Sequence, residues 1–411
     1  MAKARYYHPD YRQAEVSAIV EALDQGNSVS VIGPPSIGKT NLLRFLDQER
    51  LSVTDPNSPW MRYAPNSLEQ GPVVAINIDP NALLPALPSE RGRIAAEAWP
   101  GFELLTHRTT ITPQLYPVLH RRRNDQPDDT LLDQVERLQA RFESAHLEVT
   151  DFEDYLHAHL ALRHLENIIN ATLTSHRVQQ TPIRLAYFMD EFERLLGAMP
   201  DYFFVALRSI RDRFKYSVMF VTFTRNSLDY LSGERLAVLE PFIELFNDST
   251  VYLRPFGDDD AWRMIEQLEQ RSVSKDDYAL GLLIRETGGF AGLLRAGFKH
   301  TERLAEIAAR DYRQAITQGA TLLSAEPNIQ AECATLLRGL NREEIATLYA
   351  VVNTRRDLNP VLVRELVNKS LLAQDNAGIR VIPPVLAAYI ANTPTPPEGR
   401  AVTPPVTLPE V

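Results

Sequence analysis

The stretch VIGPPSIGKTNLL, residues 31–43, carries side chains at a spacing that suits phosphate binding. It fits the pattern G-x-x-x-x-G-K-[ST], matched here by Gly33, Gly38, Lys39 and Thr40, with a strand-like run before it and a helix-like run after it. In such loops the lysine ammonium reaches the β- and γ-phosphates of a nucleotide, and the hydroxyl ligates Mg²⁺. The alternative is a plain glycine turn, but the full pattern with both flanking elements is rare by chance. We therefore predict a site for ATP or ADP with Mg²⁺.

Two prolines stand in the first half of this loop, although proline has no N–H group to offer a phosphate. The donors of such a loop come from its second half and from the first helical turn, where the helix dipole also favours an anion. The residues expected to face the phosphates are Ser36, Ile37, Gly38, Lys39, Thr40 and Asn41. The prolines would stiffen the turn that leaves the strand and so lower the cost of ordering it.

Two acids, Asp190 and Glu191, follow the apolar run LAYFM. Downstream of a phosphate loop, the first carboxylate can hold the magnesium shell together with Thr40, and the second can orient and polarise the attacking water. The alternative is a pair of helix N-terminal acids that the dipole favours. We predict ATP hydrolysis, with Asp190 as a nucleotide and metal ligand and with Glu191 and Lys39 in catalytic roles.

A third apolar run, VMFVTFT, ends directly before Arg225. If this strand neighbours the one that carries Asp190, the guanidinium lies where it can sense or stabilise the γ-phosphate. The alternative is a solvated loop arginine. Arg225 is therefore the third predicted catalytic residue.

Apolar strands alternate with helical segments up to residue 255, which predicts an α/β fold with a parallel sheet covered on both faces. Functional residues should then gather at the carboxyl ends of the strands. Residues 80–148 are rich in proline and arginine and read as an insertion of irregular loops and short helices, followed by a longer helix. This insertion is where we expect contacts with partner proteins.

The pattern turns helical after Pro255, which divides the chain into a P-loop core (residues 1–255), a helical lid domain (256–327) and a winged helix (328–392). In the winged helix, Asn341 and Glu344 form a capping box, and AQDNAGIRVIPP reads as a two-stranded wing. The proline-rich segment 393–411 has too few apolar residues to pack and is expected to be disordered.

The composition limits the classes of protein. The 411 residues carry a formal net charge of −10, which argues against a wholly basic nucleic-acid coat, and the single Cys333 excludes an internal disulfide. No apolar run is long enough to span a bilayer, and MAKARYYHPD lacks the apolar core of a signal peptide. We expect a cytoplasmic protein that does not enter membranes.

Several stretches together resemble AAA+-related P-loop ATPases over about residues 4–304, and within that group the STAND class of signal-transduction ATPases is the most similar. The resemblance rests on GPPSIGKT, FMDEFERL, ALRSIRDRF with FVTFTR, LRPFGDDDAWRMI and TGGFAGLL, with a winged helix behind them. It implies an ATP-dependent switch in which the strand ending in TR supplies a γ-phosphate sensor, here Arg225. It also implies an adenine-side R-x-x-E element at Arg12 and Glu15, with Tyr6, Tyr7 and His8 as pocket walls.

The chain departs from the family in its lid and in its arginines. Ala291 stands where the family's glycine-rich lid motif carries proline, and the sensor arginine of origin-recognition ATPases is missing, although Arg295 lies one turn further. Residues 240–250 contain no arginine finger. These departures favour a switch that exchanges nucleotide slowly over a ring-forming motor.

Two outputs remain open. The first is protein association, including self-assembly, driven by docking of the lid and winged helix. The second is DNA binding by an AAA+ regulator or loader resembling origin-recognition or transposition ATPases. DNA could be held by the basic cluster HRRRND, residues 120–125, or by Arg364 and Lys369 of the winged helix. The acids that follow the cluster would neutralise it, and the winged helix offers few basic residues, so packing is the favoured role of that domain.

Overall fold

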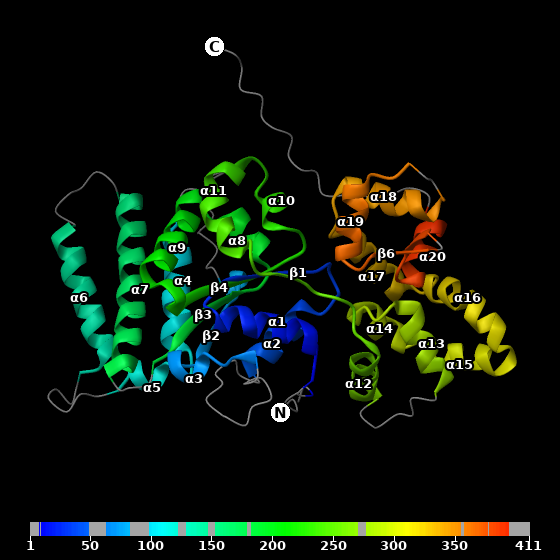
Figure 1. Ribbon diagram of the computed structural model, residues 1–411, viewed down its shortest axis with the longest axis horizontal. Helices are drawn as coiled ribbons and strands as arrows, with labels where there is room; N and C mark the ends of the chain where they lie inside the picture. Colours follow the sequence, from blue (N-terminus) through cyan, green and yellow to red (C-terminus); the bar gives the residue numbers. More distant parts are fainter. Residues whose placement is uncertain are drawn as a thin grey trace, which may run out of the picture. The chain divides into compact units, whose positions relative to one another are not determined.

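The structure is a computed structural model, and it describes residues 8, 10–48, 63–82, 98–121, 129–146, 153–178, 182–269, 277–354, 357–376 and 378–393. Figure 1 labels its helices and strands. The chain divides into two compact units. The first comprises residues 1–9, 14–31 and 43–251, and the second comprises residues 10–13, 32–42 and 252–411. The predicted positions Tyr6, Tyr7 and 122–125, and the tail beyond Thr393, lie outside the described residues.

A five-stranded parallel sheet organises the first unit, which confirms the predicted α/β fold class. The strands are β1 (Val29–Ile32), β2 (Val73–Ile78), β3 (Arg184–Met189), β4 (Val218–Thr224) and β5 (Thr250–Tyr252), in the order β2-β3-β4-β1-β5. Every residue of β3 and β4 is buried, as expected for central strands covered on both faces. The register pairs Ile78 with Met189 and Met189 with Thr222, so the carboxyl ends of three neighbouring strands meet at one edge.

Helices of the first unit pack on this sheet around one apolar cluster, to which α4, α7, α8, α9 and α11 contribute. The helices are α1 (Gln13–Asp24), α3 (Ser67–Gln70), α4 (Trp99–Ile111), α5 (Tyr116–Leu119), α6 (Leu131–His146), α7 (Glu153–Val178), α8 (Phe192–Ala198), α9 (Asp201–Phe214), α10 (Leu228–Ser232) and α11 (Leu236–Ile243). α2 (Lys39–Gln48) begins in the second unit and ends in the first.

The insertion is more regular than the sequence predicts, because α4 and α6 are helices of 13 and 16 residues. Pro100 lies in the first turn of α4, where a missing N–H costs nothing, so the proline starts the helix rather than breaking it. In α6 the buried positions are Val135 and Gln139, four residues apart. Because one of them is a polar glutamine, the spacing of apolar residues that indicates a helix is not visible in the sequence. Proline content and a buried amide therefore obscured both helices.

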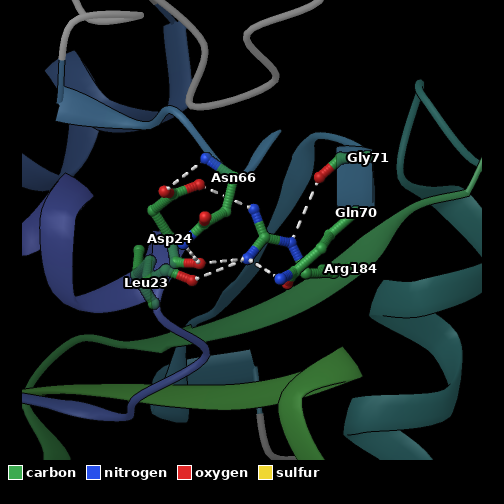
Figure 2. A network of polar contacts seen from close by, with 6 residues as sticks. All are labelled: Leu23, Asp24, Asn66, Gln70, Gly71 and Arg184. Carbon is green, nitrogen blue, oxygen red and sulfur yellow. Dashed lines mark hydrogen bonds and ion pairs between the residues drawn. The ribbon is translucent and has the colours of Figure 1, made fainter. Parts of the chain in front are cut away.

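A buried ion pair fixes the end of α1 to the start of β3 (Figure 2). Arg184 Nη2 lies 3.0 Å from Asp24 Oδ1, both side chains are about 3% exposed, and Arg184 Nη1 donates to the Asp24 carbonyl at 2.6 Å. Arg184 Nε donates to the Gly71 carbonyl, and the second Asp24 oxygen accepts from the Asn66 backbone N–H at 2.9 Å. Because each buried charge has several partners, the pair orients three segments of the first unit.

From Asp258 onward, the described residues of the second unit form helices and one hairpin. Its helices after the sheet are α12 (Asp258–Glu269), α13 (Tyr278–Thr287), α14 (Ala291–Phe298), α15 (Thr301–Arg310), α16 (Tyr312–Ser324), α17 (Pro327–Arg338), α18 (Arg342–Val352), α19 (Pro360–Asn368) and α20 (Pro384–Asn392). Strands β6 (Leu372–Asp375) and β7 (Gly378–Val381) pair antiparallel, as the wing was predicted to do. The capping box of Asn341 and Glu344 is present at the start of α18. No helix among the described residues is long and apolar enough to cross a membrane.

Candidate functional site

The predicted phosphate loop lies in the second unit, between the end of β1 and the first residue of α2. Its backbone enters the left-handed region twice, at Ser36 (φ 62°) and at Gly38 (φ 106°). Glycine suits the second position, and a non-glycine residue at the first is strained, as is common where a backbone is shaped for a ligand. The exposed Thr40 lies in the first turn of the ten-residue α2, whose N-terminus favours an anion. The loop, the lysine and the hydroxyl therefore form a donor set that fits nucleotide phosphates and Mg²⁺.

The ammonium of Lys39 is folded back onto its own loop. Its Nζ donates to the carbonyl oxygens of Gly33 at 2.5 Å and Pro34 at 3.0 Å. The Pro34 carbonyl is thus one of the acceptors for the ammonium. To reach a β- or γ-phosphate, Lys39 would exchange these carbonyls for a charged acceptor, which forms the stronger hydrogen bond.

Arg12, which the resemblance placed beside the adenine, contacts the loop and the segment after β5. It is 3% exposed, and its guanidinium donates to the carbonyls of Ile37 and Arg254 at 2.6 Å each. The guanidinium also lies 4.5 Å from the centre of the Phe256 ring, and the Arg12 backbone N–H donates to Asp260 at 3.0 Å. Arg12 therefore supports the loop, and its place beside an adenine stays a prediction.

Two helices of the second unit contact the loop at Ser36. Its carbonyl accepts from the Gly292 N–H of α14 at 2.8 Å, and its hydroxyl donates to the carboxylate of Glu332 on α17 at 2.5 Å. A Cβ at Gly292 would lie 2.5 Å from the Ser36 Cβ, and one at Gly339 would lie 2.3 Å from Pro35. Glycine at both positions lets these segments approach the loop. Glu332 thus lies next to a loop that is predicted to bind anions. No motif in the sequence marks Glu332.

The predicted carboxylates lie in the first unit, directly after β3. Asp190 is partly buried, and its Oδ1 accepts from the Glu191 N–H at 2.9 Å. Glu191 has a left-handed backbone (φ 45°, ψ 45°) at the start of α8, and its carboxylate forms an ion pair with Arg194 at 2.7 Å. A strained backbone at an acid that ends a central strand is typical of a functional position.

Arg225 follows β4, which lies between β3 and β1 in the sheet, so the condition set for its role as a sensor is met. The Arg225 backbone N–H donates to the carboxylate of Glu193 on α8 at 2.5 Å. Glu193 was not singled out in the sequence, although its place two residues after Glu191 could have suggested it. The bond ties the turn after β4 to the helix that carries the predicted catalytic acid.

The structure thus groups the predicted residues in two sets. The loop from Gly33 to Asn41 is joined by Arg12 in the second unit, whereas Asp190, Glu191 and Arg225 follow neighbouring strands of the first. Arg295 is exposed on α14. The predicted roles of all these residues in binding and catalysis stay predictions.

Comparison with known proteins finds distant similarity to solved structures alone. No protein-family profile matches the chain, and no curated protein matches it. Among solved structures it is similar to a Walker-type ATPase of Pyrococcus abyssi (14% identity, TM-score 0.44, covering 92% of this chain and 95% of that one). It is also similar to the ORC2 protein of Aeropyrum pernix, solved as ADPNP–ADP complexes (14%, 0.44, 95% and 96%). A third is the ORC1 protein of Aeropyrum pernix in complex with DNA (12%, 0.35, 93% and 92%). Similarity at this level carries no function from those proteins to this chain.

Proposed function

We propose that this chain is a Mg²⁺-dependent P-loop ATPase that works as a conformational switch. The observation that carries the proposal is the loop itself, which has the full phosphate-binding pattern and is bonded at Ser36 to two helices of the second unit. A nucleotide that enters the loop must change the surroundings of the same residue that α14 and α17 hold. The proposed domain division is a core of residues 1–255, a lid of residues 256–327 and a winged helix of residues 328–392.

In the proposed nucleotide complex, the N–H groups from Ser36 to Asn41 bind the phosphates, and Lys39 moves from its two carbonyl acceptors to the β- and γ-phosphates. Thr40 and Asp190 would hold Mg²⁺, which supplies charge neutralisation at the phosphates. Arg225 contacts the γ-phosphate, so that ATP and ADP differ in the contacts that they make.

Glu191 acts as the base that orients and deprotonates the attacking water. Its Oε2 is paired with Arg194, and both side chains are exposed enough for water to compete with the pair. The other carboxylate oxygen, Oε1, is the one that would accept from the attacking water.

The switch is electrostatic. The Glu332 carboxylate contacts Ser36, and a phosphate in the loop would bring a second negative charge next to it. Nucleotide binding therefore disfavours the contact and releases α17 from the loop. Only a few kcal/mol of differential affinity are needed to shift such an equilibrium.

The output of the switch is association with a protein partner or with a second copy. A DNA-bound regulator or loader is a second candidate that shares the same ATPase chemistry. In the winged helix, Lys369 is 2% exposed and paired with Glu344, so it cannot meet a phosphate backbone, whereas Arg364 on α19 is exposed. DNA retention that falls steeply with salt and is lost in Arg364→Ala would favour the second candidate.

Calorimetry with MgATP and MgADP tests the proposal. In Lys39→Ala the affinity for both should fall at least about tenfold, since hydrogen bonds to charged groups contribute about 1.5–3 kcal/mol. Lys299→Ala, which removes an exposed lysine of the second unit, is the matched control and should bind like the parent. Full ATP affinity in a folded Lys39→Ala would overturn the assignment of the loop.

A further inference from the structure

A cavity of about 760 Å³ lies in the insertion of the first unit, among α4, α6 and α7. These helices pack against one another, with α7 next to both α4 and α6 (Figure 1). The volume falls within the range of small-molecule sites, about 300–1,000 Å³. None of its lining residues belongs to the predicted nucleotide site, so the cavity is a separate feature of the fold.

Three carboxylates line this cavity, and the lining contains no lysine or arginine from the part of the chain that the structure describes. They belong to Glu103 of α4 and to Glu136 and Glu143 of α6. Partial burial raises the pKa of the Glu103 carboxyl, His157 opposes the rise, and the charge of Glu143 adds to it. A positively charged ligand would stabilise the charged form of Glu103 and would meet two further carboxylates in the lining, so the cavity favours a cation.

One histidine of the lining is shifted away from its charged form. Burial lowers the pKa of His164, although Glu136 and Glu143 work against the shift. The buried Nδ1 of His164 has no hydrogen-bond partner among the residues that the structure describes.

A buried amide gives a second, independent sign of a ligand. Gln139 of α6 is 5% exposed, and its Nε2 donates to Glu143 Oε1 and to the Leu160 carbonyl, both at 3.0 Å. Its Oε1 has no partner, and neither has the hydroxyl of Thr106, which also lines the cavity. Buried polar atoms normally have partners, so a ligand donor that reached these two atoms from the cavity would satisfy them.

The side chains between the carboxylates indicate which class of cation fits the cavity. Within the part of the chain that the structure describes, no three His, Cys, Asp or Glu side chains are placed to hold a metal ion. The remaining walls are largely apolar and include Trp99, Leu160 and two alanines. The lining therefore has carboxylates that are separated by apolar side chains. A ligand with ammonium groups that are separated by methylene groups would complement this arrangement.

We propose that the cavity among α4, α6 and α7 binds an aliphatic polyamine. Its ammonium groups donate to Glu103, Glu136 and Glu143, and one of them reaches Gln139 Oε1 after a small rotation of the amide. The methylene chain lies on Trp99 and Leu160.

Calorimetry of the full chain with spermidine tests this site, with uncharged 1,8-octanediol as the comparison ligand. We expect saturable binding of one spermidine and no binding of the diol. Glu103→Gln and Glu143→Gln should each weaken binding at least about tenfold, as loss of a charged hydrogen-bond acceptor does. Glu240→Gln, which removes an exposed carboxylate from α11, should leave it unchanged.

Ala140→Phe places a ring in the cavity without changing the charge of its lining. This variant tests the site if the glutamine variants lose their circular dichroism signal and so fail to fold. It should abolish spermidine binding, whereas Lys39→Ala should keep it, because the cavity does not depend on nucleotide. If Glu143→Gln and Glu240→Gln weakened spermidine binding equally, the binding would reflect attraction to the net negative charge of the protein. That result would overturn the proposal. Binding of a lysine-rich peptide through the same carboxylates, without spermidine binding, would replace it by a protein partner.

Discussion

Two regions of the molecule differ in which residues support them. One is the predicted phosphate loop, and the other is the strand edge that carries Asp190, Glu191 and Arg225. In the loop, Ser36 is bonded to Gly292 and Glu332, which lie far along the chain on α14 and α17. At the strand edge, Glu191 and Arg225 are bonded to Arg194 and Glu193 on the adjacent α8. The loop is thus bonded to two distant helices, whereas the strand edge is supported locally. Changes at the edge should alter chemistry, and changes at the loop should alter conformation.

Glu191→Gln should give the largest effect on the side of the chemistry. The amide keeps the shape of the side chain but cannot accept a proton, so ATP turnover should fall about 100-fold or more, the usual contribution of a general base. MgATP affinity and the protease sensitivity of α14 and α17 should stay as in the parent. Phosphate release and limited proteolysis measure the two properties, with Glu240→Gln as the control. Unchanged turnover would show that another residue is the base. Altered proteolysis would show that the strand edge and the loop are not independent.

Arg225→Ala should give an intermediate effect that depends on the nucleotide. If the guanidinium contacts the γ-phosphate, affinity for MgATP should fall about tenfold, as for the loss of one charged hydrogen bond, while MgADP affinity changes little. The ATP-dependent change in protease sensitivity between Phe256 and Leu340 should weaken in parallel. Titration calorimetry with both nucleotides checks this, and Arg295→Ala, on the exposed face of α14, serves as the matched control. Equal losses for ATP and ADP would assign Arg225 a structural role.

Glu332→Gln should give the smallest effect, and in the opposite direction. The amide can still accept from Ser36 but carries no charge to repel a phosphate, so MgATP affinity should rise a few-fold, roughly the scale of one partly screened charge pair. Without nucleotide, α17 should become more sensitive to proteases, because a neutral acceptor forms a weaker bond than a carboxylate. Glu343→Gln changes an exposed carboxylate of the neighbouring α18 and should do neither. A fall in ATP affinity in Glu332→Gln would contradict the proposed coupling.

What the sequence predicted correctly is local in the chain. The strands β3 and β4 are continuous apolar runs, and the capping box at Asn341 spans three residues, so short windows contain their causes. The sheet order places β4 beside β3, which is the arrangement that the prediction for Arg225 required, and its role stays a prediction. The pattern from Gly33 to Thr40 is also contiguous, and its role in binding phosphate stays a prediction as well.

What the sequence could not predict depends on contacts between distant residues. Ser36 and Glu332 are 296 positions apart, and Arg12 and Arg254 are 242 apart, so neither contact leaves a periodic or spaced signal. The cavity among α4, α6 and α7 draws its carboxylates from two helices whose periodicity was hidden by Pro100 and Gln139. Its chemistry exists only after those helices have packed.

The distance along the chain between the loop and its partners also bears on synthesis. The loop is made within the first tenth of the chain, but the residues that hold Arg12 and Ser36 emerge only with Arg254, Gly292 and Glu332. A ribosome adding about 5–20 residues per second needs on the order of ten seconds or more to supply them. During that interval the loop has none of these long-range supports, and contacts of such high sequence separation form slowly even in the finished chain. A growing polypeptide therefore carries the phosphate-binding pattern long before the contacts at Arg12 and Ser36 can form.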